Sequence, residues 1–343
     1  MTSHHYDVAS SSNPPPPLTA SRIYIGNKAK EILATRDITE ITKLVTTLCY
    51  GKETEQSSSS SKLLYEVFTK HFPNILVSKL LQIYSSGTDI TPKIRSFSLY
   101  LLDSLLTDID DFRGGLKTES LDVIKNRVST CLLSQETSYE DFKLLSRIVS
   151  RVCVDVFIGD KPWDELCSYI LSLDGNKKAL LMFSELPTVL DEEFLMPLLD
   201  NGLGLKIVSV LLMNQYYDEE EWCLALEAGF SLILQLVNLD KKSLVWDLVY
   251  VIVKSIWEMV NVKRREIVVR KGFVRVAKKV RREALRFREA EYEVVSRLGL
   301  MMLRINGLGE VTMMMVTLIH EILERYYMGG HELNQALLNQ FFY

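Results

Sequence analysis

The chain has 343 residues, of which 47% are hydrophobic and 24% are charged, and its formal net charge is −4. This composition is close to that of an average folded domain, so it excludes a chain that is disordered throughout. A single hydrophobic core usually stops growing below this length, so we expect either about two domains or one elongated array of repeats. The chain has only 16 glycines and 9 prolines, which favours helices over a turn-rich β fold.

The N-terminal residues 1–20 are predicted to be a disordered tail. They contain serines, an asparagine and the four prolines Pro14 to Pro17, and therefore offer no apolar face to bury. They also lack the apolar run of a signal peptide, so we expect the protein in the cytoplasm, the nucleus or both. Five widely spaced cysteines without a Cys-x-x-Cys pair are interpreted as reduced thiols, which fits the same compartments.

From residue 21 to residue 343 the sequence predicts a succession of amphipathic helices separated by short polar, Pro or Gly stops. A Ser-rich segment at 51–61 is expected to be a flexible loop between two of them. The expected helices after residue 200 lie at about 203–213, 218–239, 241–261, 264–288, 290–305, 310–327 and 331–342. The fold class is therefore predicted as all-α, a right-handed α-solenoid of antiparallel helix pairs of the HEAT/armadillo type.

Motifs between Asp141 and Val237 resemble the HEAT-repeat body of importin-β-type nuclear transport receptors. They are a helix that ends at Gly159, the strings Pro162-Trp163-Asp164-Glu165-Leu166 and Phe183-Ser184-Glu185-Leu186-Pro187, and Glu221-Trp222. The full chain also resembles a plant family described as armadillo-like. The resemblance implies a scaffold for protein partners and a link to nucleocytoplasmic transport. The chain departs from that family in its short length and in the absence of a long acidic loop.

Residues 263–288 stand out because they contain twelve lysines and arginines but only two glutamates, a net charge of +10 in a chain whose total is −4. Helical spacing places their apolar residues on one face and their cations about opposite, which predicts a basic amphipathic helix. The candidate residues for binding a polyanion or an acidic partner are Lys271, Arg275, Lys278, Lys279, Arg282 and Arg286.

Three interpretations of this helix stay open. Its cations could pair with acidic neighbours such as Asp218 to Glu221, which would make it only a solvated outer helix. They could bind an acidic protein, nucleic acid or an anionic membrane, because closely spaced cations release counterions on binding. The clusters at 263–265 and 278–282 could also form a bipartite nuclear-import signal, although such signals bind in an extended form.

No catalytic, cofactor-binding or metal-ligating pattern is found, so the protein is predicted not to be an enzyme and to need no cofactor. The histidines have no metal-ligand spacing, and the glycine pairs at 202–204 and 307–309 are interpreted as helix stops. The segments 244–260 and 298–323 are apolar but carry charges, so they are predicted to be buried helices rather than membrane spans. The four tryptophans are interpreted as core anchors between helices: Trp163, Trp222, Trp246 and Trp257.

Overall fold

A computed structural model describes residues 17–51, 55–87, 89–109, 117–133, 137–158, 163–173, 176–188, 190–213, 216, 218–283 and five residues between 291 and 298. Within these residues every regular element is a helix: fourteen α-helices, one π-helix and no strand. The all-α prediction is therefore confirmed. The helices expected at 310–327 and 331–342 lie outside the described residues.

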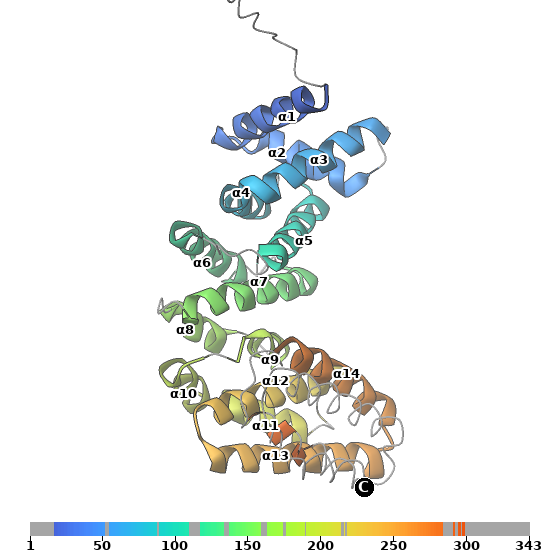
Figure 1. Cartoon of the computed structure of the whole chain (residues 1–343). Coiled ribbons are helices and arrows are strands. Elements are labelled where there is room, and N and C mark those ends of the chain that lie inside the picture. Colours follow the sequence, from blue (N-terminus) through green and yellow to red (C-terminus); the bar gives the residue numbers. More distant parts are fainter. Residues whose placement is uncertain are drawn as a thin grey trace, which may run out of the picture. The chain divides into compact units, whose positions relative to one another are not determined.

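The chain divides into two compact units (Figure 1). The first contains residues 1–109 and 116–124, and its helices are α1 (Pro17–Ala34), α2 (Thr39–Tyr50), α3 (Glu55–His71), α4 (Pro73–Ser85), α5 (Pro92–Ile109) and the start of α6 (Thr118–Leu133). Successive helices from α1 to α5 contact one another. Their apolar stripes meet in a core that includes the fully buried Phe68, Leu76 and Leu80.

A buried lysine closes one helix end in this unit. Lys79 of α4 donates through Nζ to the carbonyl oxygens of Thr35 at 2.6 Å, Arg36 at 3.3 Å and Asp37 at 3.4 Å. These carbonyls follow the last residue of α1, where the helix leaves acceptors without intrahelical partners. Burial lowers the pKa of Lys79 from its usual value. The cation therefore caps α1 from the neighbouring helix.

Two predicted boundaries in the first unit are wrong. Helix α3 begins at Glu55, so most of the expected loop at 51–61 is helical, and α1 begins at Pro17, inside the expected tail. Serine is only a slightly poor helix former, so a helix that packs through Leu64 and Phe68 extends back through the serines at little cost. Proline suits the first helical position because its missing N–H has no partner there.

The second unit contains residues 110–115 and 125–343, and Figure 1 shows its later helices gathered around α12. Its helices are the end of α6, α7 (Tyr139–Ile158), α8 (Asp164–Ser172), α9 (Asn176–Glu185), α10 (Glu192–Asp200), α11 (Leu203–Leu212), α12 (Glu219–Asn238), α13 (Lys242–Trp257), the π-helix η1 (Glu258–Val262) and α14 (Glu266–Glu283). Helix α12 contacts α9, α11, α13 and α14. It is buried from Trp222 to Leu236, so it is the central helix of this unit.

Side-chain hydrogen bonds fix α12 to its neighbours. Trp222 donates through Nε1 to Ser255 Oγ on α13 at 3.0 Å, and Ser255 donates to the carbonyl oxygen of Leu211 on α11 at 2.6 Å. At the other end of α12, Gln235 donates through Nε2 to the carbonyl oxygen of Pro187 at 2.5 Å. Since all these groups are buried, each bond satisfies a polar atom that would otherwise be costly to bury.

The N-terminus of α12 has the full capping box. Asp218 accepts from the backbone N–H of Glu221 at 2.8 Å, and the Glu221 carboxylate accepts from the backbone N–H of Asp218 at 3.2 Å. Together with Glu219 and Glu220 these side chains place negative charge at the positive end of the helix dipole. The predicted start of this helix at residue 218 is thus confirmed to within one residue.

The connection between α13 and α14 is irregular. The chain leaves α13 through the π-helix η1 and then turns at Arg264, whose φ of 54° lies in the left-handed region. The N–H of Arg265 donates to the carbonyl oxygen of Met259 at 2.8 Å across this turn. Helix α14 therefore begins at Glu266, three residues after the predicted start of the basic segment at 263.

Candidate functional site

Helix α14 lies against α12 (Figure 1), and its apolar side chains face inward as the sequence predicts. Val269, Phe273, Val276 and Val280 are fully buried. Burying side chains of this size stabilises a fold by about 1.5 to 3 kcal/mol each relative to leaving them exposed. The amphipathic basic helix is therefore present over Glu266–Glu283, while residues 284–288 lie outside the described residues.

The contact between α14 and α12 is close because one position on α14 has no side chain. A Cβ built on Gly272 would lie 2.8 Å from Cδ2 of Leu226 and 3.0 Å from Cζ3 of Trp222, both on α12. Trp222 is itself fully buried and hydrogen-bonded to α13. Gly272 thus lets the two helices approach at the point where α12 is most firmly held.

One predicted binding residue is not at the surface. Lys279 is only 1% exposed, and its Nζ donates to the carbonyl oxygen of Leu186 at 2.5 Å, just after the last residue of α9. It caps a neighbouring helix, as Lys79 does in the first unit. The inclusion of Lys279 among the polyanion-binding residues is therefore wrong, because its ammonium group is used inside the protein.

Three further cations of α14 form ion pairs with the protein's own carboxylates. The pairs are Arg275 with Glu220 at 2.6 Å, Arg282 with Glu185 at 2.8 Å and Lys271 with Glu219 at 3.9 Å. Glu219 and Glu220 belong to the acidic cluster that the first interpretation of the basic segment named as its partner. The pair at Arg275 has the shortest distance and the least exposed cation of the three, and for that reason we expect it to contribute most.

A buried carboxylate faces the same group of cations. Glu227 on α12 is 9% exposed, and burial raises its pKa to about 7, with a further contribution from the nearby carboxylate of Glu185. The cations Arg275, Lys279 and Arg282 act in the opposite direction but only partly compensate. The inner side of α14 therefore holds a network of charges whose balance changes near neutral pH.

The outer side of α14 carries a different set of residues. Ile267 is 73% exposed and Val274 36% exposed, and they lie seven residues apart on the same side of the helix. The cations on this side are exposed as well: Arg270, Lys271, Lys278 and Arg281. Of the predicted binding residues, Lys278 and Lys271 lie here, Arg275 and Arg282 lie at the border with the acidic residues, and Arg286 lies outside the described residues.

The interpretation as a bipartite import signal does not agree with the structure. Such a signal binds as an extended peptide, whereas Lys278 to Arg282 are part of α14 and Lys279 is buried. Recognition would require the end of this helix to unfold and a buried lysine to leave its acceptor. We therefore set this interpretation aside.

A surface that the sequence analysis missed lies on α13. Trp246 is 39% exposed, Tyr250 65% and Trp257 49%, and with the half-buried Val253 they follow helical spacing along one side. This aromatic row is about 16 Å long at 1.5 Å per residue. Trp163 and Trp222 are buried as expected, but the prediction that Trp246 and Trp257 are core anchors is wrong.

The reason for that error is the composition of α13. The helix is apolar on both sides, and its buried side packs on α11 and α12 through Val245, Leu248, Ile252 and Ile256. A helix that is apolar all round usually indicates burial all round, which is what the sequence suggested. The guanidinium of Arg297 lies 5.7 Å from the centre of the Trp246 ring, so the row also accepts a cation at one end.

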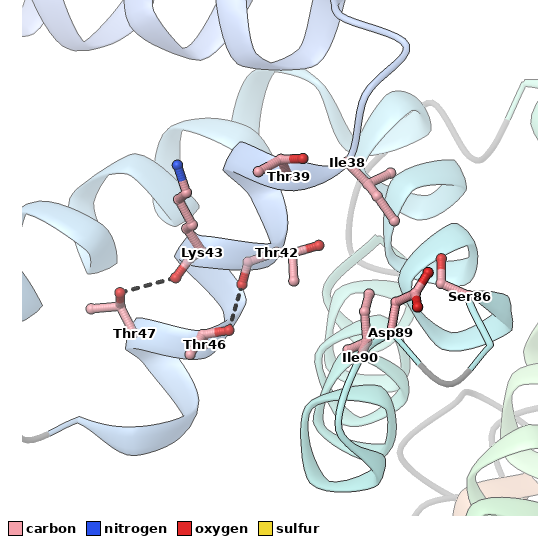
Figure 2. Close-up of a pocket in the computed structure, with 9 residues that line it drawn as sticks. All are labelled: Ile38, Thr39, Thr42, Lys43, Thr46, Thr47, Ser86, Asp89 and Ile90. Atoms are coloured by element: carbon pink, nitrogen blue, oxygen red, sulfur yellow. Dashed lines mark hydrogen bonds between the residues drawn. The ribbon is translucent and has the colours of Figure 1, made fainter.

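A pocket of about 690 Å³ lies in the first unit between α2 and the segment before α5 (Figure 2). Threonines of α2 line much of it, but Thr46 and Thr47 donate their hydroxyls to the carbonyl oxygens of Thr42 and Lys43 in the same helix. These two hydroxyl groups are therefore already used, and Ser86 Oγ, which is also in the lining, donates to the carbonyl oxygen of Gln82 at 2.6 Å.

Elsewhere in the described part of the chain, no group of three or more His, Cys, Asp and Glu side chains could hold a metal ion. Cys131, Cys153 and Cys223 are buried, whereas Cys49 and Cys167 are half-buried. Burial raises the pKa of Cys131 and of Cys223 to about 11, so these thiols are poor nucleophiles.

Among the described residues no single helix has both the length and the apolar run needed for a membrane span. Helices α10 and α11 meet that criterion only as a pair, with a bend of 56° between them.

Residues 121–290 match the model of a family described as "Repeat of unknown function (DUF577)". The match includes the basic helix, the aromatic row and the central helix α12. It agrees with the prediction of a helical repeat protein and carries no HEAT, armadillo or transport-receptor assignment. No curated protein matches the sequence significantly.

Two crystal structures of engineered proteins are similar to the chain. The first is 12% identical, with a TM-score of 0.37 over 72% of this chain and 99% of its own. The second is 15% identical, with a TM-score of 0.34 over 71% of this chain and 97% of its own.

Proposed function

We propose that this protein is a non-enzymatic scaffold that binds a partner protein through the aromatic row on α13. The observation that carries the proposal is the exposure of Trp246, Tyr250 and Trp257 along one side of a single helix. Large aromatic side chains are enriched at protein interfaces, where they dominate the binding free energy. A contiguous row of them on a surface indicates a contact site rather than scattered exposure.

The architecture we propose for the scaffold is a right-handed solenoid of antiparallel helix pairs of the HEAT/armadillo type. Three observations support it: successive helices in the first unit contact one another, the helices are joined by short connections, and residues 121–290 match a repeat family. In such arrays neighbouring repeats share a core, and the side chains left outside form an extended binding surface. A cytoplasmic or nuclear location is part of the proposal, and a link to nucleocytoplasmic transport rests on the resemblance at 141–237.

The test is site-specific photo-crosslinking with the full-length chain in cells. A photo-reactive amino acid replaces Tyr250 in the aromatic row, and in a control it replaces Tyr216, which is 76% exposed on the same unit. We expect a partner that crosslinks from position 250 but not from 216 and that is lost when Trp246 and Trp257 are both changed to alanine. Identical crosslinks from both positions would contradict the proposal.

A second candidate function is binding of nucleic acid or an anionic membrane by α14, favoured by the exposed cations Lys271 and Lys278. Binding of this kind weakens steeply with salt because counterions are released. The test is the salt dependence of RNA and anionic-vesicle binding by the wild type and by the Lys271→Glu, Lys278→Glu variant. Arg275 and Arg282 are left unchanged, because their pairs with Glu220 and Glu185 are shorter and less exposed than the Lys271–Glu219 pair, so reversing them would disturb the fold more.

A further inference from the structure

The outer side of α14 carries two aliphatic and three cationic side chains in one line. Ile267, Lys271, Val274, Lys278 and Arg281 follow one another at steps of four, three, four and three residues. At 100° per residue this spacing keeps all five on one side of the helix. In a helix–helix contact, positions with this spacing face the partner helix; here two of the five are apolar and three are cationic.

Binding of a polyanion would not use the two aliphatic residues of this line, Ile267 and Val274. Phosphate groups gain from cations but not from Ile267, which is 73% exposed, or from Val274. A protein segment can use both, because burying apolar side chains and pairing charges contribute at the same time. The outer side of α14 therefore fits a protein partner better than nucleic acid.

The charge of the outer side of α14 indicates which kind of partner protein it can bind. On one border of this side, Glu219, Glu220 and Glu185 already pair with cations of α14. Lys278 is exposed and forms no ion pair with a described residue, so it is available to a carboxylate of a partner. A partner with negative charges would be attracted to the line of cations and repelled from the acidic border, which fixes how it can lie.

We propose that the outer side of α14 binds an acidic amphipathic helix of a partner protein. Two apolar residues of that helix, seven apart, pack on Ile267 and Val274, and a flanking carboxylate pairs with Lys278. The inference rests on the proposed role as an interaction scaffold and adds the chemical class of the partner. It uses a different surface from the aromatic row, so the two can be tested independently.

The experiment measures binding of a labelled peptide to the full-length protein by fluorescence anisotropy. The peptide is a designed helix with two leucines seven residues apart and glutamates beside them. A second peptide has the same composition in scrambled order, and a labelled single-stranded RNA serves as the polyanion probe. We expect the patterned peptide to bind about tenfold or more tightly than the scrambled one.

Three variants show which side chains are responsible. Changing Ile267 and Val274 together to serine is expected to weaken binding of the patterned peptide about tenfold, and Lys278→Glu is expected to weaken it by a similar factor. Leu205→Ser, which alters another exposed aliphatic residue, and Lys254→Glu on α13 are the matched controls and should leave binding unchanged.

Equal binding of both peptides, or binding of RNA alone, would assign the surface to polyanions and overturn the inference. Absence of peptide binding at low salt would overturn it as well. The Trp246→Ala, Trp257→Ala variant should bind the peptide normally, so that a failed crosslink at the aromatic row and a failed peptide assay are separate results.

Discussion

The two sides of α14 use the same residue types for opposite purposes. On the inner side Lys279 is buried and donates to the carbonyl oxygen of Leu186, and at the border Arg275 pairs with the carboxylate of Glu220 on α12. On the outer side Lys278 and Lys271 are exposed beside Ile267 and Val274. The comparison shows that a run of basic residues is not one site: its inner half stabilises the fold, and only its outer half can meet a ligand.

The adjacent lysines 278 and 279 test this difference most directly. Lys279→Met keeps the length of the apolar stem but removes the hydrogen bond to Leu186 and leaves that carbonyl oxygen without its donor, so we expect it to lower the free energy of unfolding by about 1 to 3 kcal/mol. Lys278→Met should change it by less than about 0.5 kcal/mol. Urea unfolding followed by circular dichroism measures both, and equal effects of the two variants would contradict the division into two sides.

The charge balance of the inner side is expected to depend on pH. Burial raises the pKa of Glu227 from its ordinary value of 4.5 to about 7, so its stabilising contribution is complete at pH values below 4.5 and is lost as the pH rises through 7. Glu227→Gln should therefore resemble the wild type near pH 5 and be more stable at pH 8 by about 2 to 3 kcal/mol. Unfolding free energies at the two pH values check this, and a pH-independent difference would disprove it.

The close approach of α14 to α12 can be tested at Gly272. A side chain there meets Leu226 and the buried Trp222, so Gly272→Val should lower the free energy of unfolding by about 2 kcal/mol. Gly26 in α1 is the control, because a Cβ there has no neighbour within 4 Å. Gly26→Ala should raise stability by up to about 1 kcal/mol. A neutral effect at Gly272 would mean that the helices can move apart freely.

The ion pairs at the border between the two sides should differ in how strongly they stabilise the protein. A double-mutant cycle on Arg275 and Glu220 is expected to give a coupling free energy of about 1 kcal/mol, since the pair is short and partly shielded. The cycle on Lys271 and Glu219, which are 3.9 Å apart and largely exposed, should give about 0.3 kcal/mol or less. A larger coupling for the second pair would reverse the assignment of inner and outer cations.

Much of the fold could be predicted from the sequence because helices leave strong local signals. The start of α12 was predicted at residue 218, where Asp218 caps the helix, and the buried side of α14 follows from the spacing of its valines and Phe273. The Ser-rich start of α3 was missed because composition indicated a loop, whereas the packed residues after it extend the helix.

The candidate site could be predicted only in part. Lys279 lies seven residues after Gly272, on the packed side of α14, so helical spacing contained a signal that it is buried. Its acceptor, Leu186, is 93 residues away along the chain, and no local pattern indicates such a contact. The exposure of the aromatic row also depends on which helices cover α13, and that is a property of the packing.

The π-helix between α13 and α14 has a consequence for insertions and deletions. An insertion or deletion in η1 would change how the chain enters the turn at Arg264 and therefore how α14 packs on α12. A change in that packing would affect the buried valines of α14 and the exposure of Lys278. The five residues from Glu258 to Val262, none of which touches a ligand in either proposal, therefore set the direction in which the positive charge of α14 points.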